Sequence, residues 1–219
     1  MVYGLILLIQ PCILNAQYTK LEKSILKQGF VDIHSVDPTI RVNLMYGQRN
    51  NFCGKVLYKD LTHAFLHPKA AASLKKAQQL LKKKHPKLSL IVFDAARPMS
   101  IQQQMWNTVK RTTKFYYVSN PARGGGLHNY GLAVDVSICN QHGDTIPMGT
   151  KIDYMGAKSH TDREAQLVKV GKLSRQAMLN RRLLRSIMHQ AGFISLHSEW
   201  WHFNRVYRSV AKKHYQVIK

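Results

Sequence analysis

The chain has 219 residues, enough for one domain that buries most of its apolar surface without metals or disulfides as staples. Hydrophobic residues at 45% and charged residues at 20% are typical of a globular protein and exclude disordered and collagen-like classes. No apolar run reaches the ~20 residues that a membrane-crossing helix needs, so we expect no transmembrane span.

The charge is unusual: 33 Lys and Arg face 11 Asp and Glu, giving a net charge of +22. Such a charge suggests an anionic partner, either nucleic acid or the anionic polymers of a cell wall or membrane surface. The basic residues are spread along the chain without a tail or block, so no specific nucleic-acid partner is expected. The densest runs, Lys82–Lys84 and Arg181–Arg182, lie in helical patterns, where a solvated helix face is the simpler interpretation.

Residues 1–16 resemble a compact secretory signal with an apolar core at 5–9 and cleavage after Ala16. The alternative is a buried N-terminal strand or helix. We therefore expect an exported protein, periplasmic or secreted, with its domain at 17–219. If the segment is not a signal, the protein is cytoplasmic. Gln10 and Pro11 precede Cys12, and this context does not favour a lipid anchor.

Cleavage after Ala16 would leave two cysteines, Cys53 and Cys139. Two cysteines in an exported protein can pair, but a sequence does not show whether they lie close together. The disulfide stays an open question at this point.

The first clear helix begins at Pro68 and continues through Leu81, with apolar residues at helical spacing, lysines on the other face and Pro86 as the stop. The run 88–93 is short, apolar and β-branched, which predicts a strand that places Asp94 and Arg97 just beyond its end. Ser100 is the expected N-cap of a second helix.

Three glycines at 124–126 then interrupt the chain, and the alternating run 132–138 predicts a strand. A long helix is expected over 174–190 with Gly192 as its stop, followed by a short strand at 200–203. Helices and short strands alternate without a regular βαβ rhythm, and no repeat or linker divides the chain. The pattern predicts a single α+β domain.

Two clusters of metal-ligating residue types follow the glycine run. His128 precedes Asp135 by seven residues, and Glu199 precedes His202 by three. Two imidazoles and one carboxylate suit Zn²⁺ with an open position for water. A short Asp on a strand is a good ligand, whereas the longer Glu199 can act as a general base near the metal, but spacing alone also allows the reverse assignment.

Each cluster alone has a simpler explanation. His128 and Asp135 could be a surface histidine and a strand-end acceptor, and residues 199–202 could form the polar rim of an aromatic core. The two clusters together indicate a site, because a chain with few acids places carboxylates beside histidines twice.

The sequence resembles the zinc D,D-peptidases with a hedgehog-like fold (the LAS peptidases), and within them the D-alanyl-D-alanine dipeptidases known from vancomycin resistance (peptidase family M15). The resemblance covers roughly residues 30 to 207 in order. It implies an α+β fold with a small central antiparallel sheet flanked by helices. The segments that carry it are 51–55, 93–98, 126–135, 147–155, 180–188 and 199–202.

Carried over by position, the resemblance implies one Zn²⁺ per chain held by His128, Asp135 and His202, with Glu199 as general base. It further implies that Arg97 stabilises the oxyanion. Asp153 and Tyr46 match positions that help hold the amino end of the substrate. Two positions depart from the family's pattern: Gly126 stands where a serine is usual, and Leu127 where a polar residue is common.

These features leave three functions to compare. The first is zinc-dependent hydrolysis of free D-Ala-D-Ala in cell-wall peptide turnover, and the second is a D,D-carboxypeptidase or endopeptidase acting on longer peptidoglycan peptides. The third is a binding module without turnover, which would need neither Glu199 nor Arg97. A carboxylate such as Asp153 facing a free amine would favour the dipeptide.

Overall fold

The structure is a computed structural model, and it describes residues 18–219. The signal peptide expected over 1–16, and Cys12 with it, lie outside the described residues. No helix in 18–219 has the length and apolar character that a membrane crossing requires.

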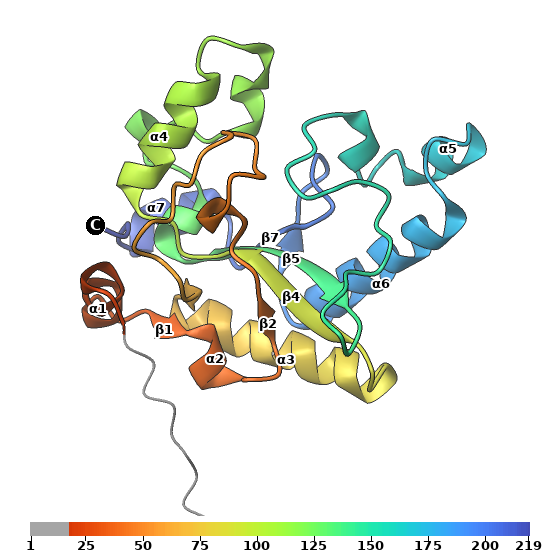
Figure 1. Cartoon of the computed structure of the whole chain (residues 1–219), viewed down its shortest axis with the longest axis horizontal. Helices are drawn as coiled ribbons and strands as arrows, with labels where there is room; N and C mark the ends of the chain where they lie inside the picture. Colours follow the sequence, from red (N-terminus) through yellow and green to blue (C-terminus); the bar gives the residue numbers. More distant parts are fainter. Residues whose placement is uncertain (1–17) are drawn as a thin grey trace, which may run out of the picture.

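A five-stranded sheet forms the centre of the molecule (Figure 1). Its neighbours are antiparallel except for the first pair, β2 and β4, which run parallel. A two-stranded antiparallel sheet lies beside it. The order in the large sheet is β2 (Arg41–Val42), β4 (Ser89–Asp94), β5 (Ala133–Cys139), β7 (His202–Asn204) and β6 (Ile194–Ser195), and the small sheet pairs β1 (Val31–Asp32) with β3 (Phe65–Leu66). The α+β prediction is confirmed, with one parallel pair that the expected antiparallel sheet did not include.

Helices flank this sheet: α3 runs beneath it and α4 lies on the opposite side (Figure 1). The α-helices are α1 (Lys20–Lys27), α2 (Ile33–Val36), α3 (Pro68–Lys84), α4 (Met99–Val109), α5 (Glu164–Lys169), α6 (Arg175–Gln190) and α7 (Arg208–His214). Short 3₁₀ turns are η1 (Met45–Gly47), η2 (Thr113–Tyr117), η3 (Pro121–Arg123), η4 (Leu127–Tyr130) and η5 (Ala157–Ser159).

The two long helices have the ends that the sequence predicts. Pro68 is the first residue of α3, where its missing N–H is not needed. The hydroxyl of Ser174 accepts a hydrogen bond from the N–H of Ala177 and so caps α6. Gly192 follows the end of α6 in the left-handed region, at φ 91°, which glycine adopts without a steric penalty.

Two predicted boundaries are wrong. Helix α4 begins at Met99 after Pro98, so Ser100 lies in its first turn and does not cap it. The last predicted strand begins at His202, not at Trp200. Trp200 and Trp201 are buried and pack edge to face in the turn before β7, so burial rather than strand pairing explains this apolar run.

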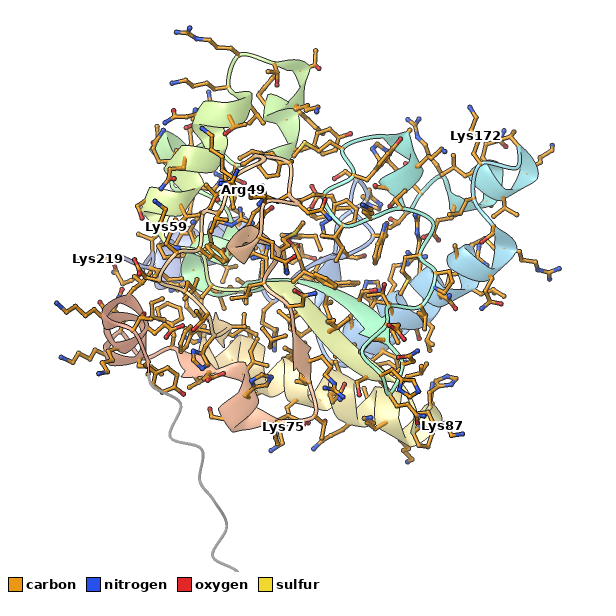
Figure 2. The ribbon with its side chains drawn as sticks, in the orientation of Figure 1. Arg49, Lys59, Lys75, Lys87, Lys172 and Lys219 are labelled. Carbon is orange, nitrogen blue, oxygen red and sulfur yellow. The ribbon has the colours of Figure 1, made fainter. Side chains whose placement is uncertain are left out.

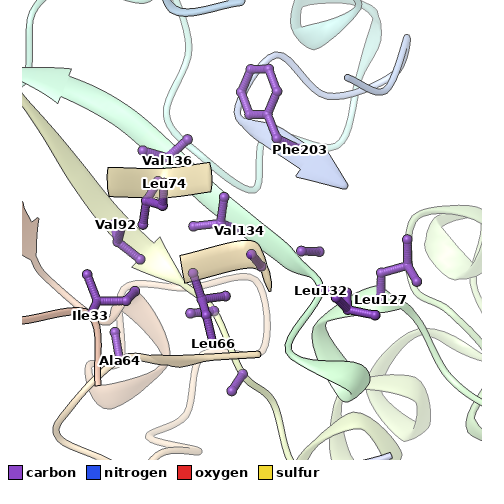
Figure 3. Close-up of a cluster of buried hydrophobic side chains, with 14 of the residues drawn as sticks. Ile33, Ala64, Leu66, Leu74, Val92, Leu127, Leu132, Val134, Val136 and Phe203 are labelled. Carbon is purple, nitrogen blue, oxygen red and sulfur yellow. The ribbon is translucent and has the colours of Figure 1, made fainter. Parts of the chain in front are cut away.

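The core fills the space between α3 and the sheet. Leu74 of α3 meets Val92 of β4 and Val134 and Val136 of β5 (Figure 3). Side chains alternate along a strand, so Asp135 points to the opposite face of the sheet from its two valine neighbours. One face of β5 therefore builds the core, and the other is free to carry a site.

Basic side chains cover the surface broadly. Lys75, Lys87, Lys172 and Lys219 lie at separate edges of the molecule (Figure 2). Lys83 and Lys84 at the end of α3 are exposed, as the solvated-face interpretation predicts.

For Arg181 that interpretation is wrong. Its side chain is fully buried, while its neighbour Arg182 is exposed. Its guanidinium donates to the carbonyls of Met148 (2.7 Å) and Lys158 (3.0 Å) and lies 5.5 Å from the ring centroid of Trp200. Burial lowers the pKa of Arg181 to about 10, so the group stays protonated at neutral pH. Arg181 thus ties the loop 147–158 to the turn before β7.

We expect Arg181→Ala to lower the free energy of unfolding by about 3 kcal/mol, because two charge-assisted hydrogen bonds and their packing are lost. Arg182→Ala removes the same charge from the same helix and should change stability by less than about 0.5 kcal/mol. Urea unfolding of both variants measures the difference. Equal stability of the two variants would show that the buried contacts contribute nothing.

Cys53 and Cys139 are both free thiols in the structure. Cys139 is buried at the end of β5, where its Sγ contacts the carbonyl of Ser89 at 3.5 Å. Cys53 lies partly exposed in the loop after η1. The possible disulfide is therefore not formed.

Candidate metal centre and active site

The register of the sheet brings distant residues together. Asp135 of β5 pairs with His202 of β7 on one side and with Asp94 of β4 on the other. Residues directly opposite each other in antiparallel strands share a face, so all three side chains are on the face away from α3. The ligand atoms of His128, Asp135 and His202 all lie within 4.8 Å of one another. This grouping is the one predicted from the sequence.

His128 is in the short turn η4, which Gly131 closes at φ 60°. The imidazole Nδ1 lies 2.7 Å from the carbonyl oxygen of Ala95, an acceptor only, so Nδ1 carries the proton and donates. The other ring nitrogen, Nε2, is 3.4 Å from Asp135 Oδ1 and 3.2 Å from His202 Nδ1. His128 therefore presents a lone pair on Nε2 to the centre of the group.

His202 has the opposite tautomer. Its Nε2 lies 2.8 Å from Asn204 Oδ1, and its Nδ1 lies 3.0 Å from Asp135 Oδ1. The hydrogen bond to Asn204 leaves Nδ1 as the ring nitrogen whose lone pair can bind a metal. Such outer hydrogen bonds fix the ring orientation of metal-ligating histidines.

The electrostatics keep Asp135 ionised. Burial acts to raise its pKa, but the His128 and His202 rings beside it outweigh burial and hold the pKa well below its usual range. Burial likewise acts to lower the pKa of His128, and the charges of Asp135 and Asp94 reverse that and raise it. A buried carboxylate between two imidazoles is a favourable place for a cation.

Glu199 lies in the turn before β7. Its Oε2 is 3.9 Å from His202 Nδ1, and its side chain is 16% exposed. Burial, together with the charges of Asp135 and Asp153, raises the pKa of Glu199 to about 7. A carboxyl with a pKa near neutral exchanges protons readily at working pH.

Arg97 is buried three residues beyond the end of β4. Its Nε and Nη2 both donate to Asp94 Oδ2, and its Nη1 donates to Gln102 Oε1 at 2.9 Å. Burial acts to lower the pKa of Arg97, but Asp94 outweighs it and raises the pKa well above its usual value. The guanidinium is a fixed positive charge in the cavity wall.

Tyr46 and Asp153 meet across 107 positions of sequence. The Tyr46 hydroxyl donates to Asp153 Oδ2 at 2.8 Å, and the Tyr46 ring lies 5.3 Å below the guanidinium carbon of Arg97. Asp153 has φ 62°, a left-handed conformation that costs energy in every residue but glycine, although least in Asp and Asn. Burial, and then the charge of Asp135, raises the pKa of Asp153 to about 7.

These side chains all line one cavity of about 270 Å³. Its wall includes the five residues Arg97, His128, Asp135, Glu199 and His202, and also Tyr46 and Asp153. A larger cavity of about 500 Å³ lies beyond Trp200 and is lined mainly by neutral side chains with Lys151. It carries none of the metal-ligating groups, so the smaller cavity is the chemical site.

The residues that orient the site were not predicted from the sequence. Asn204 lies two residues after His202 on the same strand face, a spacing that could have indicated it. The Ala95 carbonyl and Gln102 had no such signal, because a backbone oxygen and a helical glutamine look ordinary in a sequence.

Comparison with known proteins identifies the family of the chain. A family model described as D-Ala-D-Ala dipeptidase (peptidase M15) matches residues 26–219. Proteins named D-alanyl-D-alanine dipeptidase are similar: one from Escherichia coli (strain K12) is 30% identical over 79% of this chain and 82% of its own length. One from Enterococcus faecium is 27% identical over 80% and 90%, and one from Enterococcus faecalis is 25% identical over 83% and 93%.

An α+β fold with a buried His–Asp–His group beside a carboxyl and an arginine defines a metallopeptidase. The chain belongs to peptidase family M15, the D-Ala-D-Ala dipeptidase family. The resemblance drawn from the sequence is confirmed.

Proposed function

We propose that this metallopeptidase hydrolyses the free dipeptide D-Ala-D-Ala in cell-wall peptide turnover. The observation that carries the proposal is the pairing of Tyr46 with Asp153 in the same cavity as the His–Asp–His group. A carboxylate at the wall of a cavity of about 270 Å³ can pair with the free amine of a dipeptide. The names of the relatives agree with this substrate.

We propose Zn²⁺, one per chain, as the metal. Two imidazoles and one carboxylate are a common zinc set, and Nε2 of His128 and Nδ1 of His202, the nitrogens turned to Asp135, are the ones available to a metal because Ala95 and Asn204 bind the other ring nitrogens. When bound, zinc supplies Lewis-acid polarisation and makes water nucleophilic near neutral pH.

The chain's own residues supply the remaining chemistry. Glu199 accepts a proton from the attacking water and passes it to the leaving amine, a role that suits a carboxyl with a pKa of about 7. Arg97 holds a permanent positive charge for the developing oxyanion, and Asp94 and Gln102 fix its orientation. Tyr46 and Asp153 hold the amino end of the substrate.

The second candidate is a D,D-carboxypeptidase or endopeptidase on longer wall peptides, and the third is a binding module. Asp153 does not favour the peptidase on longer peptides, because a longer peptide has no free amine at that position. Glu199 and Arg97 speak against the third, because neither is needed for binding alone. We also propose that residues 1–16 direct export of the protein. Its net charge of +22 would let it associate with anionic polymers of the wall or membrane.

An assay with two substrates tests the proposal. We expect D-Ala release from free D-Ala-D-Ala and little from the same dipeptide with an acetylated amine. Asp153→Asn should lower the ratio of kcat/KM for the free dipeptide to kcat/KM for the acetylated dipeptide at least tenfold. The change should come mainly from a higher KM for the free dipeptide, because the ion pair with the amine is lost. A preference for the acetylated or a longer substrate would overturn the dipeptidase proposal in favour of wall trimming.

A further inference from the structure

A second arginine lines the cavity, and the roles above do not use it. Arg208 is the first residue of α7 and is exposed at the cavity wall. Its Nη2 donates to the carbonyl oxygens of Gly125 (2.6 Å) and Arg123 (3.2 Å). Within residues 18–219 its Nε and Nη1 have no hydrogen-bond partner. The guanidinium is thus held on one side and has free donors on the other.

A chain of contacts connects several of the residues that line the cavity. It begins at Asp153, which accepts from Tyr46, whose ring lies under Arg97. Arg97 donates to Gln102, and Gln102 Nε2 donates to the carbonyl oxygen of Ser119 at 2.7 Å. The chain of contacts thus leads from Asp153 through Tyr46, Arg97 and Gln102 to Ser119.

The chain of contacts continues from Ser119 to Arg208. A Cβ on Gly126 would lie 2.8 Å from Ser119 Oγ, so the two residues are in direct contact. Gly125, the neighbour of Gly126, accepts the hydrogen bond from Arg208. Asp153 and Arg208 consequently stand at opposite ends of this sequence of contacts, with Arg97 between them.

Gly126 is a glycine for reasons of space. Its φ of −109° is open to any residue, so backbone conformation does not require glycine there. A side chain would displace the Ser119 hydroxyl, which lines the cavity and has no hydrogen-bond partner within the described residues. A free hydroxyl and a free guanidinium edge thus both line the cavity beside residues 125–126.

We infer that Arg208, assisted by the Ser119 hydroxyl, binds the C-terminal carboxylate of the substrate. This inference rests on the proposed dipeptidase function. A free dipeptide carries an amine at one end and a carboxylate at the other, and both Asp153 and Arg208 line this cavity. Arg97 is less suited to the carboxylate, because the proposed function already gives it the oxyanion and its Nε, Nη1 and Nη2 each donate a hydrogen bond to Asp94 or Gln102.

The test compares D-Ala-D-Ala with its C-terminal amide, which keeps the amine but removes the negative charge. We expect the natural enzyme to prefer the acid, and Arg208→Ala to raise KM for the acid about ten- to a hundredfold while leaving the amide nearly unchanged. Ser119→Ala should raise KM for the acid by a smaller factor, and Arg208→Lys should keep part of the preference because it keeps the charge.

Arg111→Ala is the matched control: it removes one exposed positive charge from a residue with no hydrogen bond or ion pair in the described part of the chain. It should keep the full acid preference. Zinc content and unfolding midpoint of each variant separate substrate binding from damage to the loop that carries His128. If the natural enzyme cleaves the dipeptide but Arg208→Ala and Ser119→Ala leave the ratio of KM for the acid to KM for the amide unchanged, this inference is wrong. If the natural enzyme does not cleave the dipeptide, the proposed function is wrong.

Discussion

Replacing Glu199 by alanine is expected to lower kcat about 10²- to 10⁴-fold while the protein keeps its zinc. The carboxyl lies 3.9 Å from His202 Nδ1, and within residues 18–219 no hydrogen bond joins it to the three ligand residues, so it is placed to move a proton and not to hold the metal. Metal analysis of the purified variant and single-turnover release of D-Ala measure the two properties separately.

The comparison variant is His202→Ala, which removes a ligand atom from the group formed with His128 and Asp135. It should lose both zinc and activity. Loss of zinc to the same extent in Glu199→Ala and His202→Ala would contradict the division between base and ligand, since both carboxylates would then be ligands.

The second large effect is expected at Arg97. Arg97→Met should lower kcat by about 10²- to 10³-fold with a small change in KM, because a fixed charge that acts on the transition state is removed. The same substitution leaves the buried Asp94 without its partner, at an expected cost of about 3–5 kcal/mol in stability.

A double variant separates these effects. Asp94→Asn added to Arg97→Met removes the unpaired charge and keeps an acceptor for the hydroxyl of Tyr58. The double variant should be more stable than Arg97→Met but should have the same low kcat. Recovery of kcat together with stability would show that Arg97 acts only by supporting the fold.

Parts of this fold follow from local sequence alone. Helices α3 and α6 were predicted because their caps and stops, Pro68, Ser174 and Gly192, are local features. The strands β4 and β5 were predicted because they are apolar and longer than the others. Strands β1, β2, β3 and β6 have two residues each, too few for any periodicity to show.

In the site, too, some features follow from local sequence and others depend on contacts between distant segments. The clusters of His128 with Asp135 and Glu199 with His202 were visible because their members are close in sequence. Their meeting depends on the pairing of β5 with β7, a contact over 67 positions that no local pattern determines. Arg181 was misplaced for the same reason: the carbonyls that hold it belong to a distant loop, and an arginine on a helix resembles a solvated one.

The most direct test of a zinc-dependent dipeptidase is a metal titration of the chelator-stripped protein. D-Ala release from free D-Ala-D-Ala should be absent at first, rise in proportion to added Zn²⁺, and level off at one ion per chain, as the one group of three ligands found within residues 18–219 predicts. Full activity in the presence of chelator, or no D-Ala release with one zinc bound per chain, would contradict it.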